Sequence, residues 1–181
     1  MSRILGLDIS TSNVGWCILD KKGEFIDASA IELKKVPCVF QKAEQVRKQL
    51  KTIKDSYNIT HVAIEENLQA FRPGFSSAKT IVTLARFNGM VSLISHDIFN
   101  MSPTFMNVNA ARKSVGLKID RKSDLSTKEQ VLNFARGKIS DFEWPMRTIK
   151  SGKRKGLVLF ADSCYDISDA YVIASSCVND E

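Results

Sequence analysis

The residues of this sequence best suited to chemistry are carboxylates that stand in apolar stretches. Asp8 lies inside the run ILGLDIS at residues 4–10, where a bare negative charge is costly. Burying an unpaired carboxylate costs of the order of several kcal/mol, so such a residue usually has a hydrogen-bond partner or a metal ion. A small polar turn and a second strand-like run, VGWCILD, follow directly. The pattern predicts a β-hairpin whose first strand presents an acid.

Two later stretches supply more acids. Glu65 and Glu66 end a short apolar run, and strand alternation sends them to opposite faces, so only one of them can join a given cluster. Asp166 and Asp169 are three residues apart in a helical stretch and therefore share one face. Their apolar neighbours predict a largely buried helix, where two like charges are destabilising unless a cation compensates them.

Acids gathered from three elements suggest a metal-dependent reaction. Neighbouring carboxylates raise one another's pKa and bind protons or divalent cations. Mg²⁺ prefers an oxygen shell made of one or two carboxylates, water and phosphate oxygens. Two such ions about 4 Å apart can activate a water and stabilise the leaving oxygen of a phosphodiester. With a basic surface nearby, the sequence favours metal-dependent hydrolysis of nucleic acid.

Positive charge is concentrated in the second half of the chain. The 181 residues carry a formal net charge of +6. Residues 112–128 contain six Lys or Arg against two Asp, and residues 146–155 contain five Lys or Arg and no acid. Two basic segments in a small domain suit phosphate contacts, although ordinary solvated loops have similar composition.

Composition also limits the compartment and the type of site. No run of 18 apolar residues predicts a membrane span, and the N-terminus lacks the pattern of a signal peptide. Four cysteines have no C-x-x-C spacing, which argues against zinc and for reduced thiols. We expect a single domain over residues 1–181 without a membrane partner, in the cytoplasm of a bacterial or virus-infected cell or in an organelle.

The predicted elements give an α/β fold. Three strands with short turns predict an antiparallel meander, and two later strands are reached by helical crossovers, so that helices flank a five-stranded mixed sheet. Ser76 and Ser77 are N-cap candidates for a long apolar helix, and Asn109 is expected to cap a brief one. Residues 141–156 read as an exposed basic loop. The expected strands are 3–9, 14–19, 25–32, 61–65 and 105–108; the expected helices follow Pro37, Ser77, Asn109 and Ser126 and include 166–174.

Five motifs, in this order, resemble one known family. They are ILGLDIS with VGWCIL, then VAIEEN, then SSAKTIVTLARFNGMV, then KEQV beginning at Lys128, and finally YDISDAYVIA. In order and spacing they resemble the RuvC-like Holliday junction resolvases of the ribonuclease H-like nuclease superfamily, over nearly the whole chain. A viral or organellar member fits the long basic loop at 141–156 best.

The resemblance implies a structure-selective endodeoxyribonuclease that resolves four-way DNA junctions by symmetric paired nicks, and it leaves open whether other branched DNA is also cut. It implies a homodimer that places two active sites on opposite strands, with the long helix over 77–95 as a dimer face. Two Mg²⁺ (or Mn²⁺) per site would be held by four acids, and a lysine would neutralise the scissile phosphate. The residues are Asp8, Glu65, Asp166 and Asp169 as metal ligands and catalytic acids; Lys128 as the catalytic lysine; and Lys113, Lys118, Arg121, Lys122, Lys153, Arg154 and Lys155 as DNA contacts.

Other readings stay open at this point. Relatives often carry a stacking aromatic soon after the catalytic glutamate, where this chain has Leu68 with Phe71 nearby. The hairpin LGLDISTSNVGW also resembles the phosphate loop of the actin and sugar-kinase ATPases, which need a duplicated domain. A nuclease acting on structured RNA and a non-catalytic DNA-binding relative are the remaining alternatives.

Overall fold

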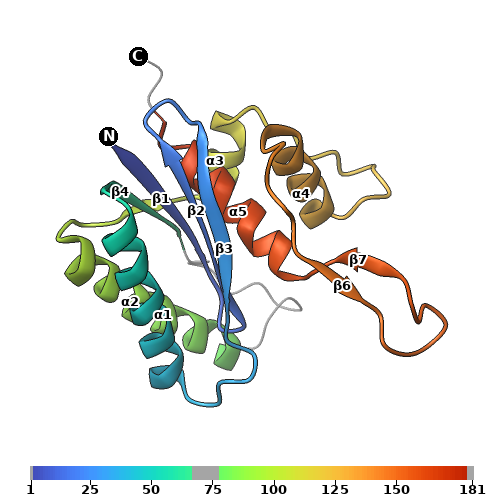
Figure 1. Cartoon of the computed structure of the whole chain (residues 1–181), viewed down its shortest axis with the longest axis horizontal. Coiled ribbons are helices and arrows are strands. Elements are labelled where there is room, and N and C mark those ends of the chain that lie inside the picture. The colour runs from blue at the N-terminus through green and yellow to red at the C-terminus, as the bar shows by residue number, and fades with distance from the viewer. Residues whose placement is uncertain (1, 67–77, 179–181) are drawn as a thin grey trace.

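A computed structural model describes residues 2–66 and 78–178. One central sheet is covered by helices on both faces, and a small two-stranded arm extends from one corner (Figure 1). No helix in the described ranges is long and apolar enough to cross a bilayer. The expected α/β architecture is therefore confirmed.

The five strands lie in the order β3-β2-β1-β4-β5. The first three form an antiparallel meander, and β4 and β5 continue the sheet in parallel with β1, as expected. Helical crossovers make the two parallel connections. The strand bounds are β1 Arg3–Ile9, β2 Asn13–Asp20, β3 Phe25–Glu32, β4 Ile59–Glu65 and β5 Thr104–Met106.

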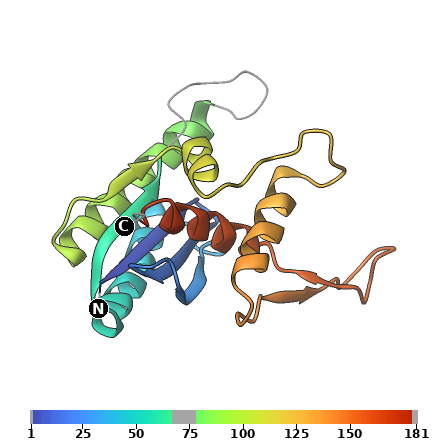
Figure 2. The same ribbon diagram turned by 90° about the horizontal axis from the view of Figure 1, so that it is seen from above.

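Two apolar cores lie on opposite faces of the sheet. Leu5, Leu7 and Ile9 of β1 point into the core under α1 and α2. Ile4 points into the other core, below α5 and α4, so strand alternation assigns the even-numbered side chains of β1 to the α5 face. The helices are α1 Val39–Ser56, α2 Ala78–Phe99, α3 Val108–Ser114, α4 Thr127–Lys138 and α5 Ser163–Ser175. Figure 2 shows the two layers from above.

The helix beginning after Pro37 has the expected buried face, with one exception. Ala43, Val46, Leu50 and Ile53 are buried as the spacing predicts. Phe40 has the spacing of this face but is 66% exposed. It is the second residue of α1 and lies in the first turn of the helix. The first half of α2 is likewise mostly exposed, and its second half buries one face, which includes Val91, Ile94 and Ile98.

Three local expectations need correction or lie outside the described residues. The cap of α3 is Asn107, whose side-chain oxygen accepts from the backbone of Asn109 and Ala110, because the strand before it ends two residues early. The expected basic loop at 141–156 contains one strand, β6 Met146–Thr148, which pairs antiparallel with β7 Val158–Phe160 just after the loop. The N-cap candidates Ser76 and Ser77 fall outside the described residues. Ser126 does cap α4, with a complete capping box to Glu129.

Candidate active site

Two glycines allow α5 to lie directly on the sheet. A Cβ added to Gly6 would stand 2.3 Å from the carbonyl oxygen of Ala170, and one added to Gly15 would stand 2.1 Å from that of Asp166. Side chains at these positions would keep the helix away. Gly15 is also the β2 partner of Asp8 in the β1–β2 ladder. The close approach therefore delivers the first turns of α5 to the strand position that carries Asp8.

The register of β1 and β4 brings the second acid to the same place. Gly6 pairs with Ala63 on the α5 face. Two residues further along each strand, Asp8 and Glu65 therefore lie side by side on that face. Their carboxyl groups hydrogen bond to each other. Glu65, and not Glu66, is the glutamate whose charge and hydrogen bond act on Asp8, as the sequence motif predicts.

Burial makes Asp8 hard to ionise. Desolvation raises the pKa of Asp8 well above its usual range, and the charges of Glu65, Asp169 and Asp166 raise it further. Desolvation is also the main cause that raises the pKa of Glu65, and the charge of Asp169 raises it further. The hydrogen bond from Asp8 lowers the pKa of Glu65. These directions favour a proton on Asp8, with its carboxyl group donating the hydrogen bond to Glu65.

The two acids of α5 have partners from other elements. The side-chain amide of Asn13 donates to Oδ2 of Asp166 at 2.9 Å. The guanidinium of Arg112 donates to Oδ1 of Asp169 at 3.2 Å, and both side chains are largely buried. Desolvation nevertheless raises the pKa of both aspartates, because these partners offset only part of the burial cost.

Lys128 lies near the acids at the start of α4. Its positive charge lowers the pKa of Glu65, Asp166 and Asp169 against the effect of burial. Its ammonium group stands 5.9 Å from the centre of the Tyr165 ring. The side chain itself is exposed. An exposed lysine beside buried acids is placed to meet an anion entering from solvent.

The other basic residues named from the sequence lie outside this cluster, on the surface around it. Lys118, Arg121 and Lys122 are on the segment between α3 and α4, which Gln130 fixes through three hydrogen bonds to Asp120 and Leu125. Lys113 is exposed on α3, and Lys153, Arg154 and Lys155 are at the end of the β6–β7 arm. Leu68 and Phe71, the candidates for a stacking side chain, lie outside the described residues.

Sequence reasoning missed Arg112 and Asn13. The sequence places Arg112 only in a basic segment. In the structure it lies on the short helix α3, which packs on α5. Asn13 was read as a turn residue, but it begins β2 two residues before Gly15 and therefore shares its face. A polar residue two positions before Gly15, on the same face of the strand, could have indicated this role from the sequence.

The donor set fits a hard divalent cation. Carboxylate oxygens are the ligands that Mg²⁺ and Mn²⁺ prefer, and the acids carry more negative charge than Arg112 and Lys128 offset. Within residues 2–66 and 78–178, however, no three Asp, Glu, His or Cys side chains are grouped closely enough to hold a metal as they stand.

Curated proteins with similar sequence share one name. The chain is 32% identical over 94 residues to the crossover junction endodeoxyribonuclease RuvC of Aliarcobacter butzleri, over 50% of this chain and 57% of that protein. It is 32% identical over 100 residues to RuvC of Campylobacter hominis, over 54% and 60% respectively. The matched region thus spans less than two thirds of each relative. No family model matches the chain.

Solved structures agree with the fold. The chain resembles Thermus thermophilus RuvC in complex with a Holliday junction substrate, with a TM-score of 0.64, 13% identity and coverage of 97% of this chain and 92% of that one. It also resembles the yeast mitochondrial Holliday junction resolvase, with a TM-score of 0.56, 14% identity and coverage of 98% and 78%. The fold is therefore that of the RuvC-like, ribonuclease H-like proteins, and the sequence similarity agrees with the motifs.

Proposed function

We propose that the chain is a metal-dependent endodeoxyribonuclease that resolves four-way (Holliday) DNA junctions by paired nicks. The observation that carries the proposal is the convergence of Glu65, Asp166 and Asp169 on Asp8. Four acids from three elements meet here, and the pKa of one of them, Asp8, is raised well above its usual value. Such a cluster destabilises the fold and suits a metal-assisted reaction. The names of the similar proteins supply the substrate class.

The four acids would hold two Mg²⁺, or Mn²⁺ in their place. When bound, the cations supply activation of a water and charge stabilisation at the leaving oxygen. To act as ligands, Asp8 and Glu65 would have to be ionised, and Asp169 would have to share its carboxylate with Arg112 or release it. Asn13 would orient Asp166 through its hydrogen bond.

Lys128 would neutralise charge on the scissile phosphate. It is exposed, and it is already close enough to lower the pKa of three of the acids. Lys113, Lys118, Arg121 and Lys122 would contact DNA around it, since all four are exposed on α3 or the segment that follows. Phosphate contacts of this kind supply sequence-independent affinity.

A homodimer would provide the second nick. A lone site cuts one strand, whereas resolution needs two cuts of opposite strands. The exposed face of α2, with Val82 at 56% and Leu93 at 60% exposure, is the apolar surface we propose for the dimer. We also propose that residues 1–181 act as a single nuclease domain, because the acids come from both ends of the chain.

The test compares four matched substrates in Mg²⁺: a four-way junction, a fork, a duplex and a structured RNA. We expect symmetric nicks in the junction. Asp8→Asn and Glu65→Gln should abolish nicking while junction binding persists, and Glu66→Gln, on the neighbouring residue, should retain it. Cleavage confined to RNA, or wild-type nicking by Asp8→Asn, would overturn the proposal.

A further inference from the structure

The β6–β7 arm is largely exposed to solvent. It comprises residues 146–160 and extends away from the layered body at the corner where α5 begins (Figures 1 and 2). All three residues of β6 and every residue from 150 to 158 are exposed. Large apolar side chains share this exposure, with Met146, Leu157 and Val158 at 50% or more. An arm with so little burial is not built to stabilise the fold.

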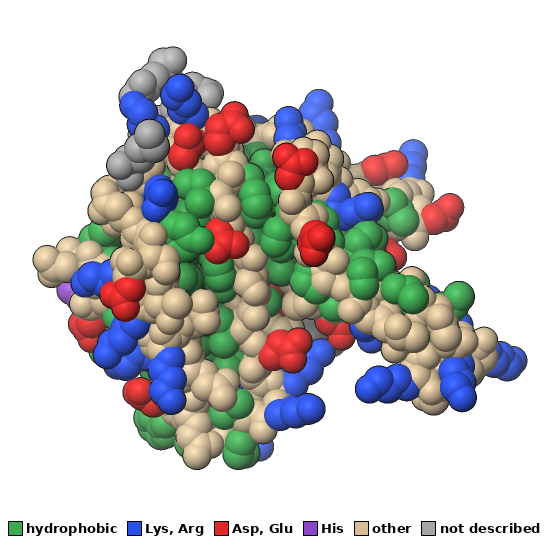
Figure 3. Space-filling view, in the orientation of Figure 1, with side chains coloured by type: hydrophobic (Ala, Val, Ile, Leu, Met, Phe, Trp, Pro, Cys, Tyr) green, Lys and Arg blue, Asp and Glu red, His purple; other side chains and the backbone are tan. Residues whose placement is uncertain are grey.

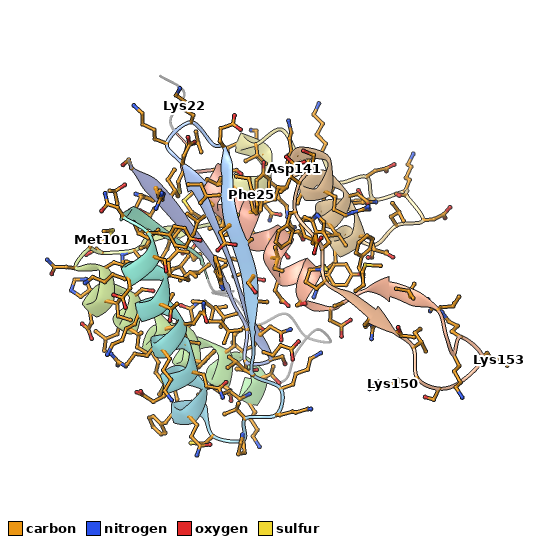
Figure 4. The ribbon with its side chains drawn as sticks, in the orientation of Figure 1. Lys22, Phe25, Met101, Asp141, Lys150 and Lys153 are labelled. Carbon is orange, nitrogen blue, oxygen red and sulfur yellow. The ribbon has the colours of Figure 1, made fainter. Side chains whose placement is uncertain are left out.

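The charge of the arm has a single sign. Residues 146–160 contain Arg147, Lys150, Lys153, Arg154 and Lys155 and no acid. In Figure 3 the end of the arm carries blue side chains without red ones among them. Figure 4 shows Lys150 and Lys153 pointing into solvent at its far end. Five like charges on a narrow ribbon repel one another, so the arm favours a polyanion.

The base of the arm is fixed next to the acids. Pro145, just before β6, accepts hydrogen bonds from the backbone of Ala161 and from the thiol of Cys164. Arg147 makes a salt bridge of 3.2 Å with Asp162 at the N-terminus of α5. The ring of Phe160 carries the guanidinium of Arg136 from α4, 4.3 Å from its centre. The arm thus leads without a flexible linker into the helix that carries Asp166.

A groove lies between the arm, α4 and the start of α5. Its volume is about 370 Å³. Arg147, Arg154 and Phe160 line it from the arm, and Tyr165, the residue before Asp166, lines it from α5. Glu129 is also on its wall, with its carboxylate engaged in the capping box of α4. Two arginines of the arm therefore border a groove that reaches the residue next to Asp166.

We propose that the arm binds the phosphate backbone of one duplex branch of the DNA, beyond the point of cleavage. This inference rests on the proposed nuclease function and names a contact surface for it. At about 3.3 Å per residue, the seven steps along the chain from Phe160 back to Lys153 reach at most roughly 23 Å. At about 3.4 Å per base pair, that reach corresponds to roughly seven base pairs along the branch. A two-stranded ribbon also fits the major groove in width.

The test removes charge from the end of the arm and measures the salt dependence of junction binding. The variant K153Q/R154Q/K155Q is compared with K21Q/K22Q/K51Q, which removes three exposed lysines elsewhere. Lys21 and Lys22 form the β2–β3 turn, at the opposite end of the strands from Asp8 (Figure 4). Both sets are made in the Asp8→Asn background, so that binding is measured without nicking.

Each phosphate contact contributes about 0.9 to the slope of log Kobs against log salt. We expect the arm variant to lose about 2 to 3 from the magnitude of this slope and the control to lose none. Hydroxyl-radical footprints should lose protection up to roughly seven base pairs from the nick, at the reach estimated above.

A second variant replaces residues 150–156 by Asn-Gly, a two-residue hairpin turn. It should reproduce the loss of slope while retaining the melting temperature. An unchanged slope and footprint in both variants, with a wild-type protein that binds and nicks the junction, would overturn the arm proposal alone. A wild-type protein that neither binds nor nicks any branched DNA would overturn the nuclease function and the arm with it.

Discussion

Gly15 of β2 lies directly against the backbone carbonyl of Asp166, so closely that a Cβ on the glycine would stand 2.1 Å from that oxygen. Because Gly15 is also the ladder partner of Asp8, one missing side chain brings an acid of α5 to an acid of β1. The chemistry of the site thus depends on a residue that contributes no functional group.

Gly15→Ala should therefore impair both stability and activity. The added methyl group meets backbone rather than a flexible side chain, so α5 must shift, at a cost of about 1–3 kcal/mol in the free energy of unfolding. A displacement of about 1 Å at reacting groups can lower a rate roughly 100-fold. Urea denaturation and nicking of a four-way junction measure the two effects.

The matched control is Gly137→Ala in α4. A Cβ there meets nothing within 4 Å, and alanine favours a helix over glycine by roughly 0.5–1 kcal/mol. The control should be slightly stabilised and should nick normally. Equal stability of the two alanine variants would contradict the close approach of α5.

Asp8→Asn should stabilise the metal-free protein at neutral pH. The pKa of Asp8 is raised in the folded state, so folding favours its protonated form. Stability from this proton is complete below the usual carboxyl pKa and is lost as pH rises through the folded value. The stability difference between the variant and the wild type should be small near pH 4 and grow toward pH 8.

Thermal melting in a chelator measures this difference. About 1 kcal/mol corresponds to roughly 2–4 °C in a chain of this size. Adding Mg²⁺ at pH 8 should raise the melting temperature of the wild type more than that of Asp8→Asn, since binding to the folded state stabilises it. A wild type that is the more stable of the two at pH 8 without metal would contradict the assignment.

A contact in this site can be predicted from the sequence when the strand pattern fixes the positions of both partners, and it cannot when their elements are brought together only by packing. Asp8 and Glu65 were predictable, because alternation and a parallel crossover fix the face and the neighbour of each acid. Arg112 and Asp169 were not paired from the sequence, because they lie 57 residues apart on elements whose relative position depends on packing. The sequence predicts a loop in place of the arm, because the glycines and lysines of residues 150–156 are typical of loops and each strand of the arm has only three residues.

Removing Arg112 should show what holds Asp169. Arg112→Gln leaves Asp169 without its charged partner in a largely buried position, and losing one member of such a pair costs about 2–4 kcal/mol. The loss should shrink as pH falls, because protonated Asp169 needs no partner. Denaturant unfolding across pH measures it.

The double variant Arg112→Gln/Asp169→Asn provides the control. It removes both charges, so it should recover most of the stability that the single variant loses. Mg²⁺ should also rescue Arg112→Gln more strongly than it stabilises the wild type, because the cation takes over the role of the guanidinium. Additive effects of the two substitutions would contradict a direct pairing.

Asn13 is the residue we expect to tune the site without binding the reacting atoms. Its buried amide donates to Asp166 at 2.9 Å from the first residue of β2. A hydrogen bond to a charged group contributes about 1.5–3 kcal/mol, and its loss frees the carboxylate to turn away. Asn13→Ala should therefore keep junction affinity, raise the Mg²⁺ concentration needed for half-maximal nicking, and lower the nicking rate about tenfold.

The Mg²⁺ titration separates orientation from simple loss of structure. Ser12→Ala, one residue earlier in the turn, tests whether any change in this segment has the same effect, and it should leave the titration unchanged. Asn13→Asp should be worse than Asn13→Ala, because it adds a carboxylate facing Asp166 where like charges already raise the pKa of the cluster. If Asn13→Ala nicks at the wild-type rate at low Mg²⁺, Asp166 is held in place by the packing of α5 on Gly15 alone.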